Sequence, residues 1–111
     1  MSGEEEEEEE GTSVTITTQP RQGPFRIGRW VRFTCSIHPI PPGRLTYRWN
    51  LQESGSAAFS YTQRQLSRKY SASHLHYCYY YCEVFADGVM MGSASRIIEV
   101  LGELMDHLDV H

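Results

Sequence analysis

Alternation of apolar and polar residues is the clearest pattern in this chain, and it begins after Trp30. The apolar residues at every second position are Val31, Phe33, Cys35 and Ile37, and those between them are Arg32, Thr34 and Ser36. Because successive side chains of a strand point to opposite faces, this pattern predicts a strand with one face in a core and the other in water. The next segment repeats the pattern, and its inward residues are Leu45, Tyr47 and Trp49.

Further strands are predicted on both sides of this pair. Residues 13–18 alternate apolar residues with threonine, which is the pattern of a short edge strand, and Pro20 ends it. Residues 74–85 are rich in tyrosine and form the longest strand candidate. Asp87-Gly88 then predicts a hairpin turn, after which residues 89–100 return as the last strand.

The remaining segments are less regular. Residues 38–43 are rich in proline and predict a turn, and the small polar residues 52–58 predict a loop. Residues 59–70 indicate a strand of uncertain register. No helical period interrupts these segments, so the chain is expected to be an all-β, antiparallel sandwich of about seven strands.

The chain divides into three parts along its length. Its 111 residues, 40% of them hydrophobic, suit a single domain over residues 13–101. Residues 1–12 contain seven consecutive glutamates, which repel one another and are expected to form a disordered leader, natural or a tag. Residues 102–111 are expected to be an acidic tail, a short helix or a linker, because Leu101, Leu104, Met105 and Leu108 recur at helical spacing.

The charge is distributed unevenly around a net value of −4. All ten lysines and arginines lie between Val14 and Val100, where the only acids are Glu53, Glu83, Asp87 and Glu99. A basic body can attract an acidic protein, a sulfated glycan or a nucleic acid, although a solubilising surface has the same composition. We expect no nucleic acid partner, because the basic residues are scattered and no nucleic-acid motif is present. No apolar run is long enough for membrane insertion.

Three motifs together resemble the immunoglobulin superfamily, in its C2 or I-type form. They are Gly28-x-x-Val31-x-Phe33-x-Cys35, Tyr47-Arg48-Trp49 and Tyr80-Tyr81-Cys82. The resemblance implies an immunoglobulin-like sandwich with a structural Cys35–Cys82 disulfide, and both cysteines have the inward parity of their strands. It also implies a core that includes Val31, Phe33 and Trp49, and a tyrosine corner made by Tyr80. A fibronectin-III-like sandwich is the alternative, against which the two strand cysteines argue.

The chain departs from that family just before the second cysteine. The family usually has an aspartate six positions before it and a small residue four positions before it, whereas this chain has His76 and Cys78. Without the aspartate, this corner of the sandwich must be held by other means. Cys78 is left as an odd thiol that points inward and cannot reach Cys82, since four strand residues span about 13 Å. It is interpreted as a small buried apolar residue, or alternatively as an intermolecular or redox-sensitive thiol.

Candidate chemistry is sparse. His74, His76 and Cys78 alternate on one strand, but only neighbouring members could chelate one ion, and no second ligand cluster exists. His38, His107 and His111 do not complete the set, so we expect no metal site and no cofactor. No nucleophile–base motif, phosphate loop or close pair of acids is present, and the chain is not expected to be an enzyme.

The most informative candidate site is the outward side of the tyrosine-rich strand. The residues predicted to face outward there and on the neighbouring strand are Thr46, Arg48, Tyr77, Tyr79, Tyr81 and Phe85. Tyrosine and arginine dominate the binding energy of protein interfaces, although tyrosines also pack across strands without a partner. The first hypothesis is a non-catalytic, adhesion- or receptor-type recognition module that binds a protein partner and belongs to a larger cell-surface or secreted, hence extracellular, protein.

Two other functions stay open at this point. I-type domains also occur in cytoplasmic proteins of the cytoskeletal and muscle type, with their cysteines reduced. The odd number of cysteines and the absence of an Asn-x-Ser/Thr site favour that structural alternative; Asn50 is the only asparagine. A third possibility is self-association through the outward tyrosines or through Cys78.

Overall fold

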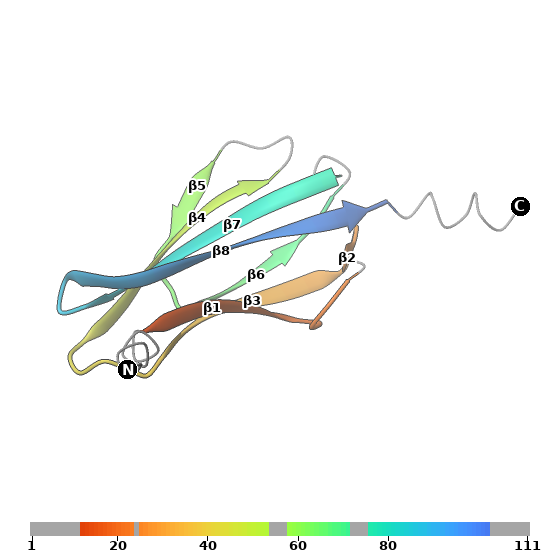
Figure 1. Ribbon diagram of the computed structural model, residues 1–111. Coiled ribbons are helices and arrows are strands. Elements are labelled where there is room, and N and C mark those ends of the chain that lie inside the picture. The colour runs from red at the N-terminus through yellow and green to blue at the C-terminus, as the bar shows by residue number, and fades with distance from the viewer. Residues whose placement is uncertain (1–11, 24, 54–57, 72–75, 103–111) are drawn as a thin grey trace, which may run out of the picture.

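The protein folds into two β-sheets packed face to face, as a computed structural model shows for residues 12–23, 25–53, 58–71 and 76–102 (Figure 1). The three-stranded sheet has the order β1-β3-β6. Its strands are β1 (Ser13–Gln19), β3 (Trp30–His38) and β6 (Gln65–Lys69). The five-stranded sheet has the order β2-β8-β7-β4-β5. Its strands are β2 (Phe25–Arg26), β4 (Leu45–Glu53), β5 (Phe59–Tyr61), β7 (His76–Ala86) and β8 (Val89–Leu101).

The prediction of an all-β sandwich is confirmed. Within the described residues the strands number eight rather than about seven, because the two-residue β2 adds a short parallel pairing to β8, whereas the other pairings found there are antiparallel. Within the described ranges there is no helix, and so no helix that is long and apolar enough to cross a membrane. The acidic leader and the helical pattern after Leu101 lie outside the described residues, except for Thr12 and Gly102.

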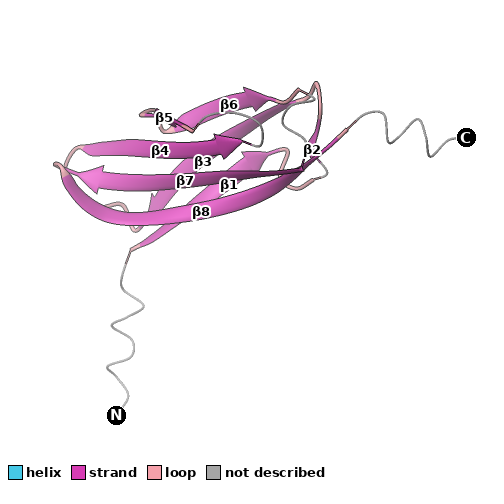
Figure 2. Cartoon of the chain, turned by 90° about the horizontal axis from the view of Figure 1, so that it is seen from above, coloured by secondary structure: helices cyan, strands magenta, loops and turns pink. Residues whose placement is uncertain are grey.

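The β7–β8 hairpin forms at the predicted turn. Asp87 has a φ of 51° and Gly88 a φ of 84°, the left-handed pair that a two-residue hairpin of the Asp-Gly type requires. Asp87 also joins this turn to the one before β4, because its Oδ1 accepts a hydrogen bond of 2.9 Å from the Arg44 amide. Further along, Val84 pairs with Gly92 and Phe85 with Met90, so β8 carries a bulge there, and the strand curves along the sheet (Figure 2).

Three sequence expectations about strand boundaries were wrong. Residues 59–70 form two strands in different sheets, β5 beside β4 and β6 beside β3, because the chain crosses the sandwich between them. The expected loop over residues 52–58 begins later, since β4 continues to Glu53, a residue that an ion pair allows to be buried. The longest strand is β8 with 13 residues, not the tyrosine-rich strand, and β7 has 11.

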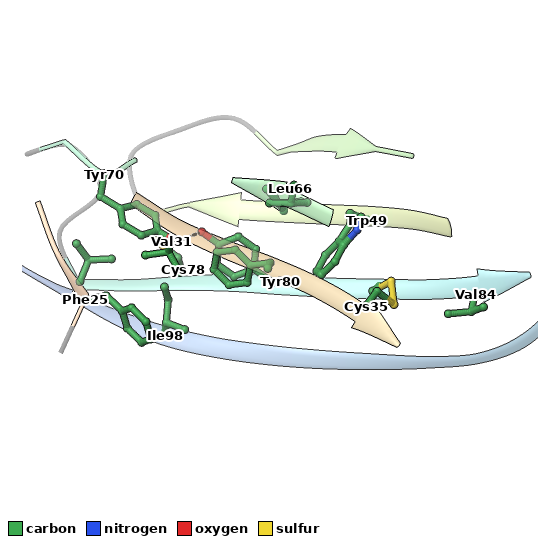
Figure 3. Packing of buried hydrophobic residues seen from close by; sticks show 14 of the residues in the cluster. Phe25, Val31, Cys35, Trp49, Leu66, Tyr70, Cys78, Tyr80, Val84 and Ile98 are labelled. Atoms are coloured by element: carbon green, nitrogen blue, oxygen red, sulfur yellow. Dashed lines mark hydrogen bonds between the residues drawn. A yellow bond between two sulfur atoms is a disulfide. The ribbon is translucent and has the colours of Figure 1, made fainter. Parts of the chain in front are cut away.

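The core lies between the sheets and is built around aromatic rings and one disulfide (Figure 3). Cys35 of β3 is bonded to Cys82 of β7, with their Cα atoms 6.5 Å apart. Trp49 lies opposite Cys82 in the β4–β7 register and is fully buried, with its indole nitrogen donating to the Gln63 carbonyl at 2.8 Å. The ring of Phe33 stacks on that of Tyr80 at 4.1 Å, and Val31 is buried beside them.

Candidate functional site

The outer face of the five-stranded sheet carries the six residues singled out from the sequence. On β7 the residues that point into the core are Cys78, Tyr80, Cys82, Val84 and Ala86, so the residues between them point outward. Tyr77 is 62% exposed and Tyr79 is 40% exposed, whereas Tyr81 and Phe85 are half-buried. Thr46 and Arg48 of β4 lie opposite Phe85 and Glu83 and are exposed. The six residues therefore lie on one face, although their exposure to solvent differs.

One half of this face is occupied by contacts among its own side chains. The Arg48 guanidinium donates a hydrogen bond of 2.9 Å to Glu83, and its Cζ lies 5.5 Å from the centre of the Phe85 ring. The Tyr81 hydroxyl also donates to Glu83, at 3.3 Å. These contacts compensate the charge of Arg48 and place its guanidinium over the Phe85 ring. This half of the face is consequently polar and electrically balanced.

The other half exposes apolar surface, and sequence reasoning missed one of its members. Ile97 of β8 lies directly opposite Tyr79 and is 63% exposed. Tyr77 is the next outward residue along β7, opposite Glu99. We call Tyr77, Tyr79 and Ile97 the apolar patch. The sequence did hold a signal for Ile97, because the inward positions of Ile98 and Val100 place the residue before them on the outer face.

The most perturbed titratable groups lie inside the sandwich, in a cluster of Glu53, Arg68, Tyr70 and Tyr80. Arg68 binds the Glu53 carboxylate through two nitrogens, at 2.6 Å and 2.8 Å, and the Glu53 side chain is fully buried. The Tyr80 hydroxyl donates to the same carboxylate at 2.8 Å and is hydrogen-bonded to the Tyr70 hydroxyl. Burial raises the pKa of both tyrosines, and the hydrogen bonds with Glu53 raise the pKa of Arg68.

This cluster corrects the expectation of a tyrosine corner. A tyrosine corner directs its hydroxyl to a backbone group a few residues upstream, whereas the single proton of Tyr80 is directed to the Glu53 carboxylate. The aspartate expected from the resemblance to the immunoglobulin superfamily is absent, and a glutamate at the end of β4 instead holds Arg68 of β6 across the sandwich. The cluster joins the two sheets, and because its carboxylate is enclosed it has the character of a structural element rather than of a catalytic site.

The buried tyrosines predict a loss of stability in alkali. Above about pH 10 the unfolded chain ionises its tyrosines, whereas Tyr70 and Tyr80 stay protonated in the fold. The unfolded state then binds fewer protons than the folded state, so the free energy of unfolding falls as the pH rises. The fall is at most about 1.4 kcal/mol per pH unit for each buried tyrosine. Below about pH 10 the two tyrosines make their full contribution to stability.

Urea unfolding between pH 8 and pH 11 measures this slope. Tyr80→Phe and Tyr70→Phe are each expected to make the decline shallower. Tyr77→Phe removes an exposed hydroxyl as the matched control and should leave the slope of the parent chain unchanged. An equally steep decline of the free energy of unfolding in all three variants would show that Tyr70 and Tyr80 do not cause the loss of stability in alkali.

The candidate thiol and metal ligands on β7 are not brought together as a site. Cys78 lies outside the disulfide, is 1% exposed, and belongs to the same core cluster as Phe25 and Tyr70 (Figure 3). At this depth its sulfur is enclosed by the core and is not presented to another chain. His74, and the side chain of His76, lie outside the described residues. Among the residues that are described, no three histidine, cysteine or acidic side chains are grouped as a metal site.

Comparison of the chain with protein-family models, with curated proteins and with solved structures finds no match in any of the three.

Proposed function

We propose that this protein is a non-catalytic recognition module that binds a protein partner through the outer face of its five-stranded sheet. The observation that carries the proposal is the apolar patch. Tyr77, Tyr79 and Ile97 are neighbours on the two adjoining strands β7 and β8, and two of them expose more than 60% of their surface. Burying one large apolar side chain stabilises a complex by about 1.5–3 kcal/mol. Tyrosine in particular contributes contact area at a low cost in conformational entropy.

The half of the face around Arg48 and Glu83 would form the rim of the proposed interface. Fully desolvated centres of interfaces are apolar and aromatic, while polar and charged groups gather around them. Arg48 and Glu83 already form an ion pair, so a partner that covers their edge does not have to neutralise an isolated charge. Thr46, Tyr81 and Phe85 complete this rim beside the apolar patch.

We infer an immunoglobulin-superfamily module from a cell-surface or secreted protein. In support, the disulfide joins the two sheets opposite Trp49, and β4, β7 and β8 are neighbours as the third, sixth and seventh strands of that family are. Disulfides persist in oxidising compartments, so Cys35–Cys82 favours this setting over a cytoplasmic structural role.

A binding screen with matched variants tests the proposal. The chain, presented as a tetramer, is screened against arrayed ectodomains, and each interaction is remeasured with Tyr79→Ser/Ile97→Ser. A genuine partner should bind that variant about 30-fold more weakly, since hot-spot residues contribute 2 kcal/mol or more. Ile40→Ser removes an exposed apolar side chain from the turn before β4, outside this face, and should leave affinity unchanged. The proposal fails if no ectodomain binds, or if binding survives in the double variant.

Self-association through the apolar patch must be distinguished from binding of a different protein. Sedimentation velocity over a hundredfold range of concentration, with and without reductant, distinguishes a monomer from a pair of chains. A dimer that dissociates in Tyr79→Ser/Ile97→Ser would make a second copy of this chain the partner. A monomer at every concentration would leave a different protein as the partner.

A further inference from the structure

The outer face of the three-stranded sheet carries a second surface, distinct from the apolar patch. Trp30, the first residue of β3, is 62% exposed on this face. Lys69 of β6 lies opposite it, with its ammonium nitrogen 5.8 Å from the centre of the indole ring. Arg29 precedes Trp30, and Arg32 is the next outward residue along β3; both are exposed. We call Arg29, Trp30, Arg32 and Lys69 the tryptophan patch.

Backbone hydrogen bonds from both sheets hold this patch in place. Before β3 the chain makes a turn in which the Arg29 amide donates to the Arg26 carbonyl at 3.2 Å. Gly28 has a φ of 86° in this turn, a conformation that favours glycine, and its amide donates to the Tyr70 carbonyl at 2.9 Å. The Ile27 amide is bonded to the Leu101 carbonyl of β8. A site with a fixed backbone loses little entropy when it binds a ligand.

Trp30 stands between two hollows of the surface. The first has a volume of about 430 Å³ and is lined by Pro20, Phe25, Arg26, Arg29, Trp30 and Val31. The second has a volume of about 590 Å³ and is lined by Gln19, Trp30, Arg32 and Ser67. Each hollow therefore combines the indole with arginine, and the second adds a neutral amide and a hydroxyl group. A ligand that crosses the indole would meet cationic side chains on both sides of it.

The positive charge of the tryptophan patch is not compensated within the described part of the chain. The carboxylates of the described residues all lie away from the patch. Glu53 is buried with Arg68, and Glu83 forms an ion pair with Arg48. Asp87 lies in the β7–β8 turn, and Glu99 is on the other sheet. No ion pair of Arg29, Arg32 or Lys69 is present among the described residues. An anionic ligand would thus gain charge–charge attraction without first displacing a protein carboxylate.

We propose that the tryptophan patch binds a sulfated polysaccharide chain. Guanidinium groups match planar and tetrahedral oxyanions with two parallel hydrogen bonds, so Arg29 and Arg32 would hold sulfate groups on either side of the indole. The apolar face of a sugar ring would pack on Trp30, and Lys69 would add a third positive charge. Gln19 and Ser67 supply the donors and acceptors that sugar hydroxyl groups require.

The geometry favours a glycan over two other polyanions. Single-stranded nucleic acid stacks successive bases on several aromatic side chains, but Trp30 is the only tryptophan, tyrosine or phenylalanine that the described residues of this face present. An acidic peptide that extends a sheet needs an edge strand. Trp30 and Arg32 instead belong to β3, which lies between β1 and β6.

Calorimetric titration of the whole chain with a size-defined heparin octasaccharide at physiological salt tests this proposal. Arg29→Ala, Arg32→Ala and Trp30→Ala should each weaken binding about tenfold, in line with the loss of one charge-assisted hydrogen bond or stacking contact. Arg44→Ala removes the same charge from an exposed arginine in the turn before β4, bonded to the β7–β8 turn, and should change affinity less than about twofold. Thermal unfolding of each variant verifies that it is folded. A variant that is not folded is replaced by the milder change at the same position, Arg29→Gln, Arg32→Gln or Trp30→Leu.

Four results would overturn the proposal. They are no binding of the octasaccharide, seen neither as heat nor as a shift in thermal unfolding, equal binding of the desulfated octasaccharide, an equal loss of affinity in Arg44→Ala, and equal or tighter binding of oligothymidylate or polyglutamate at the same residues. These outcomes do not involve Tyr79 or Ile97. The glycan proposal and the protein-recognition proposal can consequently fail separately.

Discussion

Replacing Arg68 with Met is expected to lower the free energy of unfolding by about 3–5 kcal/mol, because it leaves a carboxylate in the interior without its cation. The Glu53 side chain is fully buried, and Arg68 supplies two of its hydrogen bonds, at 2.6 Å and 2.8 Å. The Tyr80 hydroxyl donates to this carboxylate as well, but a neutral hydroxyl cannot balance its charge. The loss should appear in guanidinium unfolding as a lower midpoint with an unchanged slope.

Two controls separate charge from packing in this experiment. Glu53→Leu/Arg68→Met removes both charges and should recover most of the stability, because a buried ion pair and apolar residues of similar size are often nearly equal in stability. Arg48→Met breaks the exposed pair with Glu83 and should cost less than about 1 kcal/mol. If Arg48→Met and Arg68→Met cost the same, the buried pair does not hold the two sheets as we describe.

Removing the Cys35–Cys82 disulfide is expected to cost about 4 kcal/mol. The bond closes a loop with a sequence separation of 47, and the loss of chain entropy in the unfolded state accounts for about that amount. Cys35→Ala/Cys82→Ala would also remove two sulfur atoms from the fully buried region beside Trp49 and Phe33. Unfolding of this variant in denaturant, compared with the parent chain, measures the difference.

Cys78 provides the control for the disulfide. Cys78→Ala removes a sulfur at the same depth without opening a loop, and should cost only about 1 kcal/mol, as small core truncations do. Peptide mapping of natively sourced protein, with thiols alkylated before unfolding, should find Cys35 linked to Cys82 and Cys78 modified only after unfolding. Three free thiols after unfolding, with no Cys35–Cys82 link, would instead favour the cytoplasmic alternative.

The two proposed binding surfaces lie on opposite layers of the sandwich. The apolar patch is on the five-stranded sheet and the tryptophan patch on the three-stranded sheet, so one molecule could hold a protein partner and a sulfated chain together. Apolar burial would dominate at the first surface, and charge at the second. High salt should therefore weaken glycan binding strongly and protein binding little.

The sequence by itself determined which side of the regularly alternating strands β3, β4 and β7 faces the core. Side chains alternate along a strand whatever its neighbours are, so parity placed Val31, Phe33 and Trp49 inward and Tyr77 and Tyr79 outward. The hairpin at Asp87-Gly88 was equally predictable, because two consecutive left-handed residues are a local property of the chain.

Only the tertiary structure decided which residues meet across the sandwich and across strands. Parity could not show that residues 59–70 divide between two sheets, nor that Glu53 would pair with Arg68 in place of the missing aspartate. It placed Tyr79 on a face but not beside Ile97, and it did not bring Trp30 together with Lys69. Register and sheet pairing depend on contacts between residues far apart in the chain, and a periodic pattern carries no information about which of them pair.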